Sequence, residues 1–511
     1  MELFTTRVSM QEHLCIEQKP DPASVVIFGG WGDLTKKKLL PSLFNLYKKK
    51  LLPEKFYAIG VLSYLDSPAT DEDYRYRAFE VLGEGGDEEA FSEKLHYVPG
   101  RYDDPATYKA LADKLSALDK ANGEKPRHIF YLAVPPAFFP KIIKGLSAVG
   151  LTAKCPEGKT HCPIVVVEKP FGQDLASAKA LASELRGLLD EDQIYRIDHY
   201  LGKETVQNIL MLRFANAIFE PLWNNKYIEH IQITVSEDIG VGSRAGYYDK
   251  AGCLRDMFQN HMLQILSLIT MEPPAVFEAE RYRQEKFQLL KAIRPFDARG
   301  IEKWIVRGQY EAGEISGADV AGYLEEEGID TRSNTETFVA MKVMVDNWRW
   351  AGVPFYLRSG KRMKERVSEV AVYFKRVPHS IFPMVPPEML TQNLLVLNIQ
   401  PLEGISLTLE AKRPGPKACL GALTLDFDYR TIFGVTPPEP YERLLLDAML
   451  GDQSLFISTD GLEAAWMLLD PVLKNWVDGD GADLHRYEAG SWGPDAANEL
   501  IKRDGFFWRT S

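Results

Sequence analysis

Nine consecutive residues, Arg196 to Glu204, combine groups that could bind a phosphate with groups that could move a proton. Lys203 follows His199 by four positions, so one helical turn would place the imidazole and the ammonium on one face. Both could then contact one phosphate, and Asp198 could serve as the partner of a histidine elsewhere in the chain. Taken alone, a charged run of this kind is more often the solvated start of a helix with ordinary ion pairs.

A second stretch, Leu254 to Ile269, is apolar nearly all round in its second half, which predicts a buried helix. Its first half carries four polar residues, Asp256, Gln259, Asn260 and His261. Burying four such groups costs several kcal/mol unless each is hydrogen-bonded. A lone histidine in a core is most often satisfied by a backbone carbonyl. The neighbouring polar groups favour a ligand site instead, in which His261 could act as a base.

The element that must position these groups begins with a buried parallel strand, Val25 to Phe28, followed at once by the turn Gly29-Gly30-Trp31-Gly32-Asp33-Leu34. Apolar residues then recur at helical spacing up to Leu46. Strand, glycine turn and helix form the dinucleotide-binding arrangement, in which glycines let the backbone approach the pyrophosphate. The strict G-x-G-x-x-G pattern is not met, because Thr35 occupies its last position, and a glycine turn without a ligand is the alternative.

Two further buried strands end in residues that point to the same edge of a parallel sheet. Arg127 to Val134 ends in Pro135-Pro136, and Pro163 to Val167 is followed by Lys169. Ligands bind at the carboxyl ends of strands in open α/β sheets, so Pro135 and Lys169 could both line the site. Ordinary strand-end turns are an equally good explanation of either position alone.

The remainder of the chain contains many strand patterns. Residues 229 to 235 alternate like an antiparallel strand with one exposed face and lead into Glu237, and residues 353 to 361 end in a glycine turn with Lys361 and then Arg366. We therefore expect two domains in succession. The first is a Rossmann-like α/β domain, and the second is a larger α+β domain with a big, mostly antiparallel sheet. The expected boundaries are a loose leader over residues 1–23, the dinucleotide-binding domain over 24–198 and the α+β domain over 199–511.

Composition excludes several classes of function. The formal charge of −12 over 511 residues argues against nucleic acid as a partner, and no apolar run approaches the roughly 20 residues that span a bilayer. Five scattered cysteines and the lack of a signal-peptide pattern favour a cytoplasmic protein. No cluster of histidines, cysteines and carboxylates has the spacing of a metal site.

The run from Arg196 to Glu204 resembles the signature of the glucose-6-phosphate dehydrogenase family, and the order of motifs is similar to that family over nearly the whole chain beyond the leader. The resemblance implies oxidation of C1 of glucose 6-phosphate to 6-phosphogluconolactone, the entry step of the oxidative pentose phosphate pathway, with hydride transfer to NADP or NAD and no metal. It implies that His261 is the general base and Asp198 its partner. It also implies a homodimer or homotetramer formed through the large sheet.

Further residues match positions of the family's pattern. Those that would contact the substrate are His199, Tyr200, Lys203, Glu237, Asp256, Lys361, Arg366 and Lys169. Those that would contact the cofactor are Gly29, Gly32, Asp33, Leu34, Ser63, Pro135 and Lys169. Two positions depart from the family. Trp31 replaces a small hydroxylated residue, and Ser63 replaces the arginine that ordinarily meets the NADP phosphate. The resemblance implies NADP as the cofactor. Because Ser63 replaces the arginine, NAD is possible or preferred, although Lys36 or Lys37 could supply the missing charge.

Two other functions compete with this interpretation. A catalytically silent binding protein on the same fold would have no reason to retain Asp198, His199, Lys203 and His261 together. A dehydrogenase for an unphosphorylated sugar should lack the phosphate-binding cations, which this chain has.

Overall fold

The computed structural model describes residues 19–62, 70–83, 86–123, 125–154, 161–297, 300–382, 385–416, 419–434, 437–478 and 483–510. The chain forms two compact units, each discontinuous in sequence. Unit 1 comprises Met1–Phe171, Lys179–Gly202 and Ile432–Thr459, and unit 2 comprises Gly172–Ala178, Lys203–Thr431 and Asp460–Ser511. The contiguous division at residue 198 stays a prediction about domains, and the compact units depart from it at 172–178, 199–202 and 432–459.

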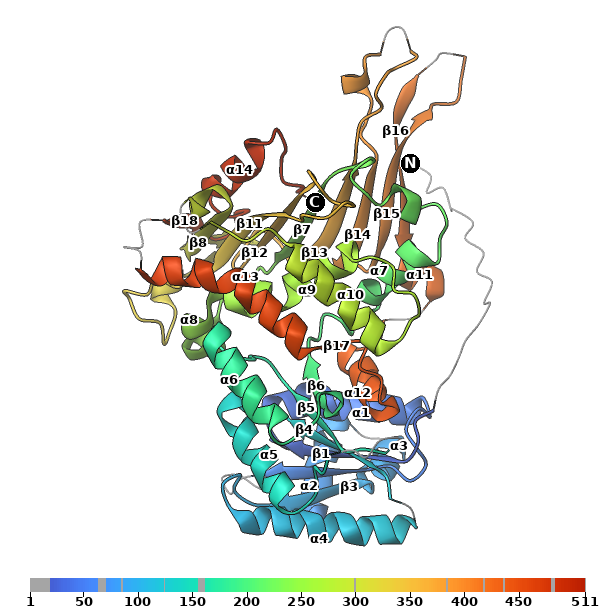
Figure 1. The fold of residues 1–511 in the computed structure, drawn as a ribbon, viewed down its shortest axis with the longest axis vertical. Coiled ribbons are helices and arrows are strands. Elements are labelled where there is room, and N and C mark those ends of the chain that lie inside the picture. The colour runs from blue at the N-terminus through green and yellow to red at the C-terminus, as the bar shows by residue number, and fades with distance from the viewer. Residues whose placement is uncertain are drawn as a thin grey trace. The chain divides into compact units, whose positions relative to one another are not determined.

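Unit 1 is built on a seven-stranded sheet in the order β17-β6-β5-β4-β1-β2-β3 (Figure 1). All its strands are parallel to their neighbours except β17, which is antiparallel to β6. The strands are β1 (Ala23–Phe28), β2 (Tyr57–Leu62), β3 (Leu95–Pro99), β4 (Arg127–Leu132), β5 (Ile164–Val167), β6 (Ile194–Ile197) and β17 (Phe456–Ile457). Successive strands are added first on one side of β1 and then on the other. Right-handed crossovers therefore place helices on both faces of the sheet.

The helices of unit 1 are α1 (Leu40–Lys48), α2 (Asp71–Leu82), α3 (Gly86–Ser92), α4 (Pro105–Asn122), α5 (Phe139–Ala148), α12 (Pro440–Leu450) and the second part of α6 (Leu175–Arg186). Helix α12 comes from far along the chain and lies beside α1 (Figure 1). The buried carboxylate of Glu442 accepts hydrogen bonds from Asn45 Nδ2 at 2.8 Å and from Lys49 Nζ at 2.6 Å. These charge-assisted contacts attach the late segment to the first crossover of the sheet.

Unit 2 is built on a nine-stranded sheet in the order β16-β15-β14-β13-β7-β12-β11-β8-β18, in which only the pairs β7–β12 and β8–β18 are parallel. The strands are β7 (Ile228–Ser236), β8 (Ile305–Glu311), β11 (Phe338–Met344), β12 (Pro354–Gly360), β13 (Val367–Phe374), β14 (Leu394–Gln400), β15 (Gly404–Lys412), β16 (Leu420–Asp428) and β18 (Leu484–Glu488), with a separate hairpin of β9 (Gly313–Ile315) and β10 (Ala318–Val320). The expected fold classes, a Rossmann-like sheet and then a larger mostly antiparallel sheet, are confirmed.

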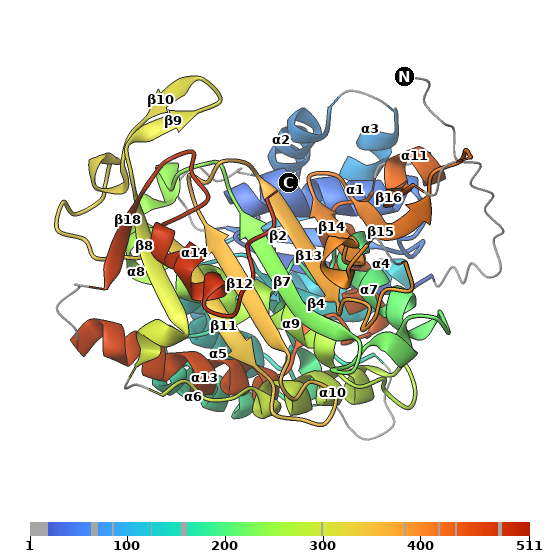
Figure 2. The ribbon, with the colours of Figure 1, turned by 90° about the horizontal axis from the view of Figure 1, so that it is seen from above.

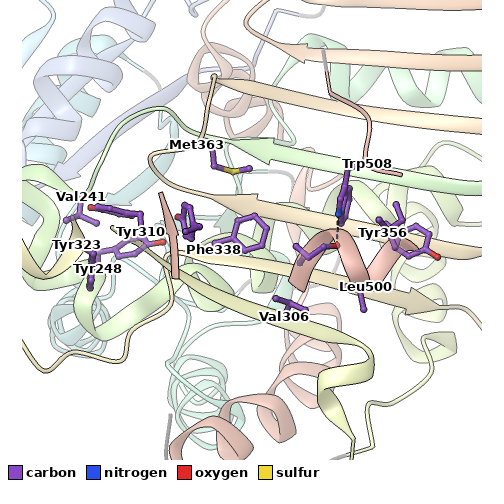
Figure 3. Packing of buried hydrophobic residues seen from close by; sticks show 14 of the residues in the cluster. Val241, Tyr248, Val306, Tyr310, Tyr323, Phe338, Tyr356, Met363, Leu500 and Trp508 are labelled. Atoms are coloured by element: carbon purple, nitrogen blue, oxygen red, sulfur yellow. Dashed lines mark hydrogen bonds between the residues drawn. The ribbon is translucent and has the colours of Figure 1, made fainter. Parts of the chain in front are cut away.

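The helices of unit 2 are α7 (Glu204–Phe214), α8 (Ala245–Cys253), a π-helix (Leu254–Met262), α9 (Leu263–Thr270), α10 (Ala279–Ala292), α11 (Tyr429–Phe433), α13 (Thr459–Asp478) and α14 (Asp495–Lys502). Helix α14 lies across β8 and β11, as the view onto the sheet in Figure 2 shows. A hydrophobic core of aromatic and aliphatic residues, among them Val306, Phe338 and Leu500, fills this contact (Figure 3). There the indole of Trp508 donates a hydrogen bond to the carbonyl of Ala497 at 2.8 Å and is itself buried.

The prediction that residues 229–235 expose one face is wrong, because β7 is buried almost throughout. Other segments supply hydrogen bonds to its polar side chains: Arg358 donates to the Thr234 hydroxyl at 3.1 Å, and the C-terminal segment contacts Gln232. The Gln232 side chain donates to the carbonyl of Phe507 at 2.9 Å and accepts from the Arg509 amide at 2.7 Å. Alternation of polar and apolar residues indicates that one face of a strand is exposed to solvent only when no other segment forms hydrogen bonds with its polar side chains. Among the described residues, no helix is long and apolar enough to cross a membrane.

Candidate active site

The glycine turn after β1 packs tightly against the turn after β4. Gly29 has a φ of +82°, and a Cβ on it would lie 2.3 Å from the carbonyl oxygen of Ala133. No other residue type fits this position without a shift of backbone. β1 lies between β2 and β4, so these two turns flank the point where the strand order reverses. Open α/β sheets bind nucleotides in that crevice. Gly29 and Pro135 therefore lie at the carboxyl edge of the sheet, as the sequence predicts.

The helix that follows the turn starts at Asp33, before Leu40, the first residue of α1. Its first backbone bond joins the Lys36 amide to the Gly32 carbonyl at 3.0 Å, so the amides of Asp33, Leu34 and Thr35 have no acceptor within the helix. A helix start with amides of this kind suits the pyrophosphate of a dinucleotide. The residues present therefore fit a dinucleotide cofactor.

The lysines after the turn, of which Lys37 is exposed and Lys36 and Lys38 are half-buried, pair with nearby carboxylates. Lys37 Nζ lies 3.4 Å and Lys36 Nζ 3.8 Å from the carboxylate of Asp33, and Lys38 Nζ lies 2.8 Å from that of Glu439. Surface pairs of this kind are weak, so Lys36 and Lys37 could still turn toward an anion. Ser63, the position expected to read the cofactor's 2′-phosphate, lies outside the described residues.

The run predicted to bind phosphate begins in the last residues of β6 and continues beyond its end. Asp198 is 1% exposed, and its Oδ1 accepts the Tyr200 amide at 3.0 Å. The chain then makes two successive turns, because the Leu201 amide donates to the Asp198 carbonyl at 3.0 Å and the Gly202 amide to the His199 carbonyl at 3.2 Å. The prediction that one helical turn aligns His199 with Lys203 is therefore wrong. The Asp198 side chain competes for backbone amides and favours a turn, and helix α7 begins only after Lys203.

The His199 ring is flanked by two tyrosine rings within unit 1. Tyr200 meets it edge-on with centroids 5.1 Å apart, and Tyr441 from α12 lies parallel to it, with centroids 6.4 Å apart and an interplanar angle of 6°. Lys169 follows β5 at the same edge of the sheet. No local pattern in the sequence around Tyr441 indicates its contact with His199.

In unit 2, the predicted base lies in a π-helix rather than an ordinary α-helix. Asp256 and His261 both belong to Leu254–Met262 and are 5% and 1% exposed. The Tyr247 hydroxyl lies 3.4 Å from Asp256 Oδ1. π-Helical turns are rare and occur often at functional sites, because the wider turn redirects side chains. The predicted burial of this segment is confirmed.

Three more predicted substrate residues meet at one end of the large sheet. Gly360 and Ser236 are opposite each other in the parallel pair β12–β7, and Val367 of β13 is opposite Ser236 on the other side. The next residues along, Lys361, Glu237 and Arg366, therefore share this end. Lys361 Nζ lies 2.6 Å from Glu237 Oε2, and Arg366 is exposed. The register of three strands thus brings one carboxylate and two cationic side chains, which are far apart in sequence, to the same end of the sheet.

Asp198, His199, Tyr200 and Lys169 belong to unit 1, and Lys203, Glu237, Asp256, His261, Lys361 and Arg366 belong to unit 2. The roles of these residues stay predictions. The pairing of Asp198 with His261 stays a prediction.

Comparison with known proteins identifies the family. Residues 26–208 match the model of the glucose-6-phosphate dehydrogenase NAD-binding domain, and residues 210–509 match that of the C-terminal domain. The chain is 44% identical over 496 residues to the glucose-6-phosphate 1-dehydrogenase of Aggregatibacter actinomycetemcomitans, covering 96% of this chain and 98% of that protein. It is 45% identical to the enzyme of Rhizobium meliloti, covering 96% and 98%.

Solved structures agree with these relatives. A glucose-6-phosphate dehydrogenase in complex with glucose 6-phosphate superimposes with a TM-score of 0.86 at 35% identity, covering 96% of this chain and 99% of that one. The enzyme of Mycobacterium avium gives a TM-score of 0.81 at 36% identity, covering 97% and 99%. The two family models together span the strand-and-turn crevice of unit 1 and the π-helix and strand ends of unit 2. On this sequence and fold, the chain belongs to the glucose-6-phosphate dehydrogenase family.

Proposed function

We propose that this protein oxidises glucose 6-phosphate at C1 to 6-phosphogluconolactone, with a nicotinamide dinucleotide as hydride acceptor. The observation that carries the proposal is that both family domains match over almost the whole chain, in which the family's pattern is retained except at Trp31 and Ser63. The relative solved with glucose 6-phosphate supports the choice of substrate.

In this mechanism His261 removes the proton of the C1 hydroxyl group. Hydride loss from an alkoxide is far easier than from a neutral alcohol, so a base at this position lowers the barrier. Asp198 orients the imidazole and stabilises the imidazolium that forms. A nicotinamide cofactor would supply the acceptor for the hydride that leaves C1. The residues proposed to hold that cofactor are Gly29, Gly32, Asp33, Leu34, Pro135 and Lys169.

The substrate is held far from C1 by its phosphate group. His199, Tyr200 and Lys203 are the proposed phosphate-binding residues, with Lys361 as a further cation. Glu237 and Asp256 are the residues proposed to accept hydrogen bonds from sugar hydroxyls, with Arg366 as a further positive charge. Binding energy from a remote dianion can be used to position the reacting carbon, so these residues contribute to rate as well as affinity.

The primary test is a rate assay with glucose 6-phosphate and, in parallel, NADP and NAD, followed by nicotinamide absorbance. Turnover with either cofactor supports the proposal. Absence of turnover with both, in a protein that is folded by circular dichroism, would contradict it and favour the silent binding protein. Turnover with unphosphorylated glucose but not with its phosphate would favour the other dehydrogenase.

Lys203→Ala should raise KM for glucose 6-phosphate by about 10- to 100-fold with a smaller effect on kcat, because it removes a cation that neutralises the phosphate. Lys203 is 4% exposed, so loss of a buried side chain needs its own control. Lys286 is 5% exposed in the same unit, and its Nζ donates to Gln264 at 2.9 Å. Lys286→Ala should leave KM unchanged. Equal KM values for the two variants would remove Lys203 from the phosphate site.

We propose NADP as the cofactor, with NAD accepted or preferred because Ser63 occupies the usual arginine position. Ser63→Arg should raise the ratio of kcat/KM for NADP to that for NAD by about tenfold, since a guanidinium can bind the 2′-phosphate bidentately. Ser63→Ala measures what the hydroxyl itself contributes. An unchanged ratio in Ser63→Arg would mean that other residues, such as Lys36 or Lys37, contact the 2′-phosphate.

We also propose a homodimer or homotetramer formed through the outer strands of the large sheet. On β16, Leu423, Leu425 and Phe427 are 48%, 36% and 41% exposed and point to one face. Their partners across the β15 register are Leu409, Leu407 and Ile405, so six apolar side chains share that face. A contiguous apolar surface of this kind is typical of an association surface.

Leu425→Asp should reduce the molecular mass measured by analytical ultracentrifugation to that of smaller species, because it introduces a charge into the proposed interface. The neighbouring Thr424 is exposed and points to the opposite face of β16, so Thr424→Asp is the matched control and should keep the wild-type mass. A mass unaffected by Leu425→Asp would move the interface elsewhere.

A further inference from the structure

Glu168, directly after β5, is the centre of a hydrogen-bonded group that the mechanism above does not use. Tyr131 Oη donates to Glu168 Oε1 at 2.5 Å, and the Tyr441 hydroxyl lies close enough to the same carboxyl group to lower its pKa. Tyr131 is fully buried and Tyr441 is 8% exposed. All three residues belong to unit 1, although they come from β4, the turn after β5 and α12. Two phenols from distant parts of the sequence therefore converge on one carboxyl group.

This carboxyl group is electrostatically linked to predicted site residues. Burial raises the pKa of Glu168, while the two tyrosine hydroxyls and the charge of Lys169 lower it and that of Asp198 raises it. Glu168 thus lies close enough to Lys169 and Asp198 for their charges to act on it. A carboxyl group in such surroundings is costly unless its partners are fixed, and the two phenols fix it.

Tyr441 connects this group to the phosphate-binding run. Its ring is parallel to the His199 imidazole, 6.4 Å away between centroids, while Tyr200 meets the same imidazole edge-on at 5.1 Å. Both arrangements are favoured for aromatic pairs at these separations. A phenylalanine at 441 would supply the same ring but could not be held by Glu168. The hydroxyl therefore matters for where the ring lies.

We propose that Glu168 and Tyr441 are positioning residues for His199: Glu168 fixes the Tyr441 phenol, and the Tyr441 ring keeps the imidazole oriented toward the substrate phosphate. The inference rests on the proposed phosphate-binding role of His199. Positioned groups raise affinity because less side-chain freedom is lost when the ligand binds. The expected signature is a loss of affinity confined to phosphorylated ligands.

The test compares the full-length enzyme with Tyr441→Leu, Tyr441→Phe and Glu168→Gln. KM for glucose 6-phosphate and the inhibition constant of inorganic phosphate should both rise about tenfold in Tyr441→Leu, and about threefold in the other two variants, which keep the ring. The kcat/KM for unphosphorylated glucose should stay within about twofold of the wild type, because that substrate makes no use of His199.

Tyr57→Phe is the matched control for loss of a buried hydroxyl. Tyr57 is 2% exposed at the start of β2, at the opposite edge of the same sheet, and its hydroxyl donates to Asp119 Oδ1 at 2.7 Å. It should change none of the three constants. Equal losses with phosphorylated and unphosphorylated substrate in the Tyr441 and Glu168 variants would indicate general structural damage and overturn the inference.

His199→Ala separates failure of this inference from failure of the proposed function. If His199→Ala leaves KM for glucose 6-phosphate unchanged, the phosphate-binding role of His199 is wrong and the inference falls with it. If His199→Ala raises KM but Tyr441→Leu does not, only the inference is overturned. When Tyr441→Leu is combined with His199→Ala, KM for glucose 6-phosphate should rise no further than in His199→Ala alone. Should Tyr441→Leu fail to fold, unchanged constants in both Tyr441→Phe and Glu168→Gln overturn the inference.

Discussion

His261→Asn is expected to lower kcat by about three orders of magnitude while KM for glucose 6-phosphate stays within about threefold of the wild type. Asparagine is similar in size and can hydrogen-bond but cannot take up a proton at catalytic pH. Because the π-helix buries His261 to 1% exposure, the substitution changes chemistry more than surface. The measurement is steady-state turnover of glucose 6-phosphate, with folding checked by thermal melting.

His230→Asn is the matched control for this prediction. His230 is a second buried histidine of unit 2, 3% exposed, whose ring is stacked on Tyr373 and Phe506 with centroids 4.3 and 4.1 Å away. Burial lowers the pKa of His230 to about 4, so it is neutral near pH 7 and serves packing. Its replacement should reduce the melting temperature and leave kcat nearly unchanged. Near-normal turnover in His261→Asn would remove His261 as the base.

Asp198→Asn is expected to lower kcat by about 100-fold, the second largest effect. The new amide oxygen can still accept the Tyr200 amide that Asp198 Oδ1 now accepts at 3.0 Å, so the turn after β6 should persist. What is lost is the negative charge that would stabilise the imidazolium of His261. Steady-state kinetics over a range of pH, together with the melting temperature, provides the measurement.

Asp447 offers a matched carboxylate in the same unit. It is fully buried in α12, where its Oδ2 accepts a hydrogen bond from Arg443 Nε at 3.0 Å, and burial raises the pKa of Asp447 to about 7. Asp447→Asn should leave kcat unchanged. A similar fall in kcat in both variants would show that any buried carboxylate of unit 1 matters equally, and Asp198 would lose its special role.

The sequence by itself determined the parts of this protein that depend on neighbouring residues. The apolar run before Gly29, the glycine turn and the apolar spacing up to Leu46 predict strand, turn and helix because each depends on interactions within a few positions. Burial of the segment around His261 follows from its apolar residues in the same way. The family resemblance rests on the same local motifs, and the comparisons confirm it.

Only the tertiary structure decided which distant residues meet. The register of β12, β7 and β13 places Lys361, Glu237 and Arg366 at one sheet end, and the return of α12 to unit 1 brings Tyr441 beside His199. Asp198 favours turns over the helix that spacing had suggested for His199 and Lys203. Local spacing could not reveal these features, because contacts between distant segments, and competition among alternative hydrogen bonds, are settled only when the whole chain packs.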